Sequence, residues 1–325
     1  MKITRRSLLG VFSLASVLPN LAFAQSAYPE RVITLVVPFP PGGSIDMIAR
    51  VLVSEITAKT ATNIVVANRP GAAGQLGAGS VANARPDGYT LLFASAGAMS
   101  VAPAVNPNLK YDPLRDFTYI ARAGDLPYVL LVGADSPIQD LASLRKAALE
   151  HKGGLNYGSH GVGSFNHLLG AMLNEALDGK LTHIPFKGSA SALQALAAGE
   201  IHILFDTMPG AGPFLAGKSI RPLAMSTTKR TTTDPQIPSM GEFGLPQVVG
   251  STWTGVLGPA GTPSAVVDWM NREVNAALDE PTVRERFAGL GVEVRAGSPE
   301  ALAEFVRVDV DRWISVAKAH NITVQ

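Results

Sequence analysis

The chain of 325 residues has no cysteine and few aromatic residues, and both shortages exclude classes of function. Without cysteine there is no thiol nucleophile, no cysteine-ligated zinc and no iron–sulfur cluster, while an oxidising compartment remains permitted. Aromatic residues make up 6% of the chain, which is too few for a surface that stacks sugar rings or single-stranded nucleic acid. The sequence therefore argues against thiol chemistry and against recognition by stacking.

Charge is also scarce, since 16% of the residues are charged and the net charge is +1. Without a basic excess, no nucleic-acid partner is predicted. The chain has no phosphate-binding P-loop motif. His160 and His167 lack the spacing of a zinc motif, so neither a metal nor another cofactor is expected. No run past the N-terminus reaches the ~20 apolar residues that cross a membrane.

The N-terminus has the three parts of a secretory signal peptide. Three cations fall within the first six residues, an apolar run covers residues 8–18, and Ala22-Phe23-Ala24 precedes Gln25 as a small-residue cleavage site. The paired arginines at positions 5 and 6 resemble the twin-arginine export signal, although paired arginines also occur in ordinary Sec signals. We predict that residues 1–24 are removed and that the mature protein is periplasmic.

The rest of the chain alternates strand-like apolar runs with amphipathic helical patterns, which predicts an α/β fold with mostly parallel sheets. Its length predicts two domains. The strand-like runs are residues 32–37, 64–67, 90–94, 128–132, 201–205, 222–225 and 254–257. Residues 227–246 are rich in Thr, Pro and Gly and predict an irregular connection. The last strong helix is expected to start at Thr262-Pro263, with Thr262 as the N-cap.

Two strand–loop–helix units carry the candidate binding residues. In the first, Gly42-Gly43 lets the backbone approach a ligand, and Ser44 is expected to cap a helix that begins near Ile45. A helix N-terminus offers unpaired N–H groups and partial positive charge, which suit a carboxylate. A turn that binds nothing fits the same loop, and Asp46 fits a simple dipole-compensating role in the first helical turn.

The second loop, residues 158–164, follows the same logic with more polar side chains: Ser159, His160 and Ser164, with His167 one turn further on. Asp206 ends a strand-like run, where an open α/β sheet binds its ligands. It is suited either to accept a hydrogen bond from a ligand amine or to cap the turn after it. A hydrolase that uses Ser159 and His167 is the alternative from a different class, although no nucleophile elbow or triad is assignable.

Several motifs, in order along the whole mature chain, resemble the Bug receptors, the TctC-like substrate-binding proteins of tripartite tricarboxylate transporters. The first spans residues 37–50 and contains Pro40-Pro41-Gly42-Gly43-Ser44. The others are Asn68-Arg69-Pro70-Gly71-Ala72-Ala73-Gly74, Pro86-Asp87-Gly88-Tyr89, Pro185-Phe186-Lys187-Gly188-Ser189, Phe205-Asp206 and Gly258-Pro259-Ala260-Gly261-Thr262-Pro263.

The resemblance implies a two-lobed periplasmic-binding-protein fold of type II, a Venus flytrap with two crossings between its lobes. The implied boundaries are residues 25–124 and 251–325 for a discontinuous first lobe and 125–250 for the second. The implied protein is a monomeric receptor, not an enzyme. It captures a small carboxylate (a dicarboxylate, tricarboxylate, amino acid or aromatic acid) and hands it to membrane permease subunits. A sensing or scavenging receptor without transport is the alternative within the fold.

The resemblance also implies a set of ligand-binding residues, to which the loop argument adds Ser44. Carried over by motif, they are Phe39, Gly42, Gly43, Asp46, Ser95, Ser159, His160, Gly163, Ser164 and Asp206.

Overall fold

The computed structural model describes residues 28–178 and 180–324, so the predicted signal peptide and its cleavage site lie outside the described residues. The strands are β1 Ile33–Val37, β2 Ile64–Asn68, β3 Thr90–Ser95, β4 Phe117–Gly133, β5 Leu155–Ser159, β6 Leu181–Pro185, β7 Ile203–Thr207, β8 Ile220–Met225, β9 Ser251–Pro259 and β10 Glu293–Val294. The helices are α1 Ser44–Thr60, η1 Ala72–Gly74, α2 Gln75–Ala82, η2 Gly97–Val101, α3 Ala102–Val105, α4 Leu141–Glu150, α5 Phe165–Ala176, α6 Ser189–Ala197, α7 Met208–Ala216, α8 Ser264–Asp279, α9 Pro281–Gly289 and α10 Pro299–Ala319.

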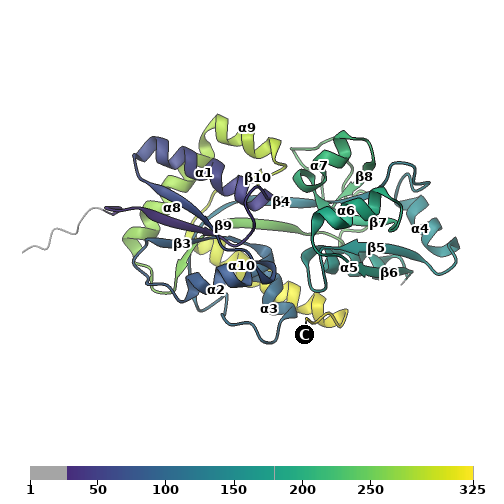
Figure 1. Ribbon diagram of the computed structural model, residues 1–325, viewed down its shortest axis with the longest axis horizontal. Coiled ribbons are helices and arrows are strands. Elements are labelled where there is room, and N and C mark those ends of the chain that lie inside the picture. Colours follow the sequence, from purple (N-terminus) through teal and green to yellow (C-terminus); the bar gives the residue numbers. More distant parts are fainter. Residues whose placement is uncertain (1–27, 179, 325) are drawn as a thin grey trace, which may run out of the picture.

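The chain forms two lobes that share one strand. The strand order is β2-β1-β3-β9-β4-β7-β5-β6, with β8 and β10 paired to β4. In the first part of β4, Phe117 to Pro127 pair with β9. From Tyr128 onward β4 pairs with β7 and β8 instead. Figure 1 shows β4 and β9 at the junction of a body that contains α1, α8 and α9 and a body that contains α4 to α7. We call the body with β1, β2, β3 and β10 the first lobe and the body with β5 to β8 the second lobe.

Apolar side chains cover both faces of the sheet. One cluster packs α1, α8 and α9 onto one face of the first lobe, with Ile48, Leu52 and Phe287 fully or almost fully buried. A larger cluster continues from the first lobe into the second through Trp313, whose ring centroid lies 4.5 Å from that of Phe165. The lobes are therefore joined by packed aromatic side chains as well as by strands.

The parallel sheet predicted from the alternating pattern is found in each lobe, but the centre of the sheet is antiparallel. Strands β1, β2 and β3 are mutually parallel, as are β5, β6 and β7. Strand β9 is antiparallel to β3 and to β4 because it returns the chain from the second lobe to the first. The fold is thus a mixed α/β fold.

Two expectations about helices are wrong. Thr262 is not an N-cap, because its hydroxyl donates to the Pro259 carbonyl at 2.7 Å, and α8 starts at Ser264 after Pro263. Nor is α8 the last strong helix, since α9 and the 21-residue α10 follow it. The irregular connection predicted for residues 227–246 has neither helix nor strand. The domain boundaries predicted from the resemblance stay a prediction.

Candidate functional site

The strand directions bring the predicted loops together between the lobes. Strand β3 is antiparallel to β9, and β9 is antiparallel to β4, so β1, β2 and β3 run in the same direction as β4. Strand β4 runs from the first lobe into the second, where β7, β5 and β6 run against it. The carboxyl ends of the parallel strands of each lobe therefore point toward the other lobe, at the edge where open α/β sheets bind ligands.

In the first lobe, Asp46 holds the loop between β1 and α1. Its carboxylate is 1% exposed and accepts hydrogen bonds from the Gly42 N–H at 2.9 Å, Asn68 Nδ2 at 2.8 Å and Arg50 Nε at 2.8 Å. Asn68 Nδ2 also donates to the Phe39 carbonyl at 3.0 Å. Burial raises the pKa of Asp46, but the hydrogen bonds from Arg50, Asn68 and Gly42 outweigh it and lower the pKa overall. Asp46 is thus an ionised group that shapes the loop.

The expectation that Ser44 caps α1 is wrong by one residue. The N-cap is Gly43, in extended conformation with φ −74° and ψ 163°, and Ser44 is already helical. No side chain caps this helix. The Gly43 carbonyl accepts from the Met47 N–H at 3.0 Å, the first intrahelical bond of α1. The earlier N–H groups of the first turn have no carbonyl to bond within a helix, so they are available to an anion.

In the second lobe, Ser159 contacts a histidine that the sequence analysis did not assign to it. Its hydroxyl, on a fully buried residue at the end of β5, shares a 2.6 Å hydrogen bond with His183 Nε2 of β6 and also contacts the backbone of Gly161. His167 instead accepts the Gly163 N–H at Nδ1, 3.0 Å away. The pairing of Ser159 with His167 expected for a hydrolase is therefore absent from this part of the described structure.

His160 and Asp206 come together at the ends of β5 and β7. His160 Nε2 lies 3.0 Å from Asp206 Oδ2, and Ser189 Oγ donates to the same carboxylate oxygen at 2.6 Å. Asp206 Oδ1 accepts the Thr207 N–H at 2.7 Å, while the turn that follows is capped by the Thr207 hydroxyl. Asp206 is 1% exposed, whereas the His160 side chain is more accessible to solvent.

The helix N-terminus of α5 repeats the arrangement of α1. Ser164 is its N-cap in extended conformation, and the Ser164 hydroxyl lies 2.7 Å from Asn166 Oδ1. Asn166 is fully buried and also accepts the His160 N–H at 3.2 Å. Gly163 has a left-handed φ of +74°, and a Cβ there would lie 2.6 Å from Val324 of the first lobe. The second loop therefore already touches the first lobe.

Ser95 lies at the carboxyl end of β3, 1% exposed and at the same sheet edge as the first loop. Sequence reasoning missed the supporting polar residues Asn68, Asn166, Ser189 and His183. Asn68 and Ser189 fall in motifs that carry the family resemblance, so the signal was present, but their partners become visible only in three dimensions.

Among the described residues, no group of three or more His, Asp or Glu side chains is placed to hold a metal ion. No described helix has both the length and the apolar character needed to cross a membrane.

The two lobes, the shared strands and the two facing loops define a periplasmic-binding-protein fold of type II. The sequence matches the family described as "Tripartite tricarboxylate transporter family receptor" over residues 48–322. It is 32% identical to "Protein BugT" of Bordetella pertussis over 321 residues, covering 98% of each chain. The chain therefore belongs to the TctC family of tripartite tricarboxylate transporter receptors, which includes Bug proteins.

Solved structures of similar chains carry small carboxylates. One is "R. palustris Rpa4515 with adipate", which is 33% identical, with a TM-score of 0.83 over 91% of this chain and 99% of the other. Another is MatC from Rhodopseudomonas palustris with bound malate, at 34% identity and a TM-score of 0.78 over 89% and 99%. Members of the family are solute-binding proteins, and the two solved relatives named here hold adipate and malate. This chain is accordingly a binding protein and not an enzyme, which removes the hydrolase alternative.

Proposed function

We propose that this protein captures a small carboxylate between its lobes and delivers it to a permease of the tripartite tricarboxylate type. The observation that carries the proposal is a pair of helix N-termini, those of α1 and α5, that lie at sheet edges pointing toward one another. Neither N-terminus has a side-chain capping hydrogen bond. Each offers backbone N–H groups to an anion. Family membership supports the transport context, and the similar chains bound to malate and adipate support the class of ligand.

The first loop is proposed to hold one carboxylate through its backbone. Neither Lys nor Arg lies within residues 39–46, and the carboxylate of Asp46 is turned inward to Gly42 and Asn68. The other residues proposed to surround the ligand are Phe39, Gly43, Ser44, Ser95, Ser159, His160, Gly163, Ser164 and Asp206. Of these, Ser159 and Asp206 have internal partners, so we assign them to positioning the loop rather than to direct contact.

Gly43→Val tests the anion clamp, because Gly43 has an ordinary extended φ and a Cβ there would meet only the Pro40 carbonyl, at 3.4 Å. The variant should fold and lose adipate and malate binding in calorimetry, since a branched side chain then stands where the ligand approaches. Gly297→Val is the matched control, because nothing lies within 4 Å of its Cβ position. Equal loss in both variants, or retained binding in Gly43→Val, would refute this placement of the ligand.

The charge of the ligand is tested by replacing one carboxylate with its amide. If adipate or malate binds, its monoamide should bind at least about tenfold more weakly, because a charge-assisted hydrogen bond contributes ~1.5–3 kcal/mol. Calorimetry on acid and amide gives the comparison. Equal affinities would mean that the loops recognise something other than a carboxylate.

The proposal places the mature protein in the periplasm as a monomer, with lobes formed by residues 25–124 and 251–325 and by residues 125–250. The three-part N-terminus supports export. N-terminal sequencing of periplasmic extract should find Gln25 as the first residue. Recovery of the intact N-terminus, or of a chain that begins well past residue 27, would contradict this expectation.

A further inference from the structure

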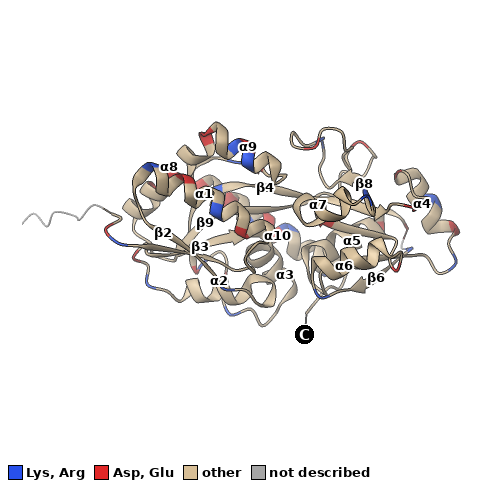
Figure 2. Cartoon of the chain, turned by 45° about the horizontal axis from the view of Figure 1, so that its top comes forward, with Lys and Arg blue, Asp and Glu red and all other residues tan. Residues whose placement is uncertain are grey.

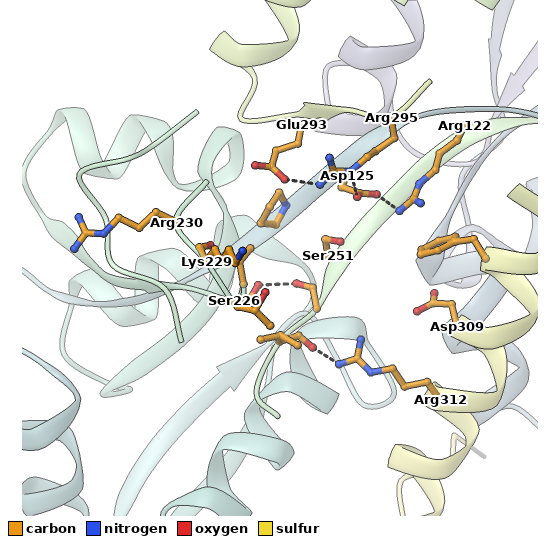
Figure 3. A pocket seen from close by; sticks show the side chains of 16 residues that line it. Arg122, Asp125, Ser226, Lys229, Arg230, Ser251, Glu293, Arg295, Asp309 and Arg312 are labelled. Atoms are coloured by element: carbon orange, nitrogen blue, oxygen red, sulfur yellow. Dashed lines mark hydrogen bonds and ion pairs between the residues drawn. The ribbon is translucent and has the colours of Figure 1, made fainter. Parts of the chain in front are cut away.

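A cavity of about 440 Å³ lies at the junction of the lobes and shares no lining residue with the two loops. Its first-lobe wall comes from β4, β10 and α10, with Arg122, Arg295 and Arg312 (Figure 3). Its second-lobe wall comes from residues 226–230 and from Val249 and Gly250. The volume falls within the range of small-molecule sites.

Cations outnumber acids in this lining. Five Lys or Arg side chains line the cavity, against Asp125, Glu293 and Asp309. Along α8 and α9, by contrast, both signs of charge are mixed (Figure 2). The excess is therefore a local feature of the cavity.

The acids are already occupied by partners at the cavity's edge. Asp125 is held by Arg122 and by Arg295, whose Nε lies 2.9 Å away, and Arg295 also pairs with Glu293 at 2.9 Å. Asp309 accepts the indole N–H groups of Trp253 at 3.2 Å and Trp313 at 3.0 Å. Burial raises the pKa of Asp309, although the hydrogen bonds from Ser100, Trp313 and Trp253 and the nearby charge of Arg312 act in the opposite direction.

Three cationic groups keep unused donors. Arg122 lies over the Phe305 ring at 3.5 Å, and its buried Nε has no hydrogen-bond partner among the described residues. Arg312 donates to the Val249 carbonyl. In Figure 3, no ion pair joins Lys229 or Arg312 to a lining carboxylate, and Arg230 extends away from the cavity, where it pairs with Glu242. Lys229 and Arg312 stand on walls that belong to different lobes.

We propose that this cavity is a second binding site, for a small oxyanion that is held between Lys229 of the second lobe and Arg312 of the first. Because the two cations sit on different lobes, their separation depends on the angle between the lobes. An anion that satisfies both therefore favours one lobe angle, and its binding is linked to that of the ligand in the cleft. This linkage rests on the lobe motion of the proposed function, whereas the anion site itself does not.

Inorganic phosphate is the probe for the site. Calorimetry on the mature chain should show saturable phosphate binding that Lys229→Gln and Arg312→Gln each weaken about tenfold, as expected for the loss of one charge-assisted hydrogen bond. Two control variants remove the same charges elsewhere. Lys146→Gln changes an exposed residue of α4, and Arg307→Gln changes an exposed residue of α10 that pairs with Glu304 and Asp311. Both should leave phosphate binding within about twofold.

The outcomes separate the site from the cleft. No saturable binding to the unaltered chain would overturn the proposal, and so would equal losses in the control variants. Phosphate binding that disappears in Gly43→Val but persists in Lys229→Gln would place the anion at the first loop and also overturn it.

The linkage has its own test. Saturating phosphate should change the affinity for adipate in the unaltered protein and leave it unchanged in Lys229→Gln. The same affinity with and without phosphate in the unaltered protein would overturn the linkage. If adipate fails to bind at all, the proposed ligand class fails, while the phosphate titrations still decide the second site.

Discussion

At the residue scale, one buried carboxylate organises the first loop. Asp46 joins the loop backbone at Gly42, the end of β2 at Asn68 and the next turn of α1 at Arg50. The dipole-compensating role predicted for an acid in the first helical turn is compatible with this position, but it is only part of what the side chain does. Its larger contribution is to hold three segments in one arrangement, which fixes the helix N-terminus where we propose that a carboxylate binds.

Asp46→Asn is expected to destabilise the protein by about 1–3 kcal/mol, because an amide cannot accept all three hydrogen bonds and leaves Arg50 without its ion-pair partner. Urea unfolding measures the loss. Asp268→Asn, an exposed position on α8 in the same lobe, serves as the control and should change the stability by less than ~0.5 kcal/mol. Similar values for the two variants would show that the Asp46 network contributes nothing beyond a surface charge.

The two candidate loops were predicted from the sequence, whereas the hydrogen-bond partners inside them were not. Gly42-Gly43 follows one apolar run and Asp206 follows another, and both patterns are local in the sequence. The structure puts them at facing edges of the sheet. The bond between Ser159 and His183 depends on the pairing of β5 with β6, where Tyr157 and Ser159 lie opposite His183 and Pro185. That register is a tertiary property, so chain proximity suggested the wrong histidine, His167.

At the scale of elements, a stacked histidine pair supports the second loop. His167 of α5 and His183 of β6 have ring centroids 3.7 Å apart and planes 10° from parallel. Burial lowers the pKa of His167 to about 4, with further lowering from His183 and His320, and burial lowers that of His183 to about 4. The neutral form fits the geometry, because His167 Nδ1 accepts the Gly163 N–H.

This pair predicts a loss of stability on mild acidification. Both pKa values lie below the ordinary value of 6.5, so the unfolded chain takes up protons first. The neutral pair therefore contributes fully to the free energy of unfolding above pH 6.5. This contribution declines as the pH falls toward 4, by on the order of 1–2 kcal/mol once solvent screening is allowed for.

The loss of stability is measured from the midpoint urea concentrations of unfolding at about pH 7 and about pH 5. Most carboxylates stay ionised between these two values. His167→Gln should flatten the dependence because the amide does not titrate. Lys146→Gln, at an exposed lysine of α4, should keep the slope of the unaltered protein. An unchanged slope in His167→Gln would exclude the stacked pair as its source.

Strand β4 was predicted only in part and helix α10 not at all, for different reasons. Only residues 128–132 of β4 were predicted, because Gly124 and Pro127 normally interrupt a strand. Here Gly124 is required, since a Cβ would lie 2.6 Å from Val292 and 2.7 Å from the Glu293 carbonyl, where β10 packs. Helix α10 does carry a clear local signal, with Ser298 as N-cap, Pro299 next and buried Leu302, Val306 and Val310 on one face.

At the scale of the whole molecule, the connections between the lobes set what motion is available. Strand β4 and the start of β9 cross together, and Phe165 packs between Tyr128, 4.9 Å away, and Trp313. Crossing strands permit bending with little loss of pairing, while the aromatic contact resists complete separation. The alternating pattern predicted two α/β units but not this junction, because nothing local in a strand marks the residue at which its neighbours change.

A ligand held by both loops should therefore compact the protein. Contacts from α1 and α5 to one molecule exist together only when the lobes approach, so binding favours the closed arrangement. Small-angle scattering of the mature chain should give a smaller radius of gyration with saturating adipate or malate than without it. Gly43→Val at the same ligand concentration should keep the ligand-free value, which separates closure from a solvent effect. An unchanged profile in the unaltered protein, with binding established by calorimetry, would mean that the lobes hold their ligand without closing.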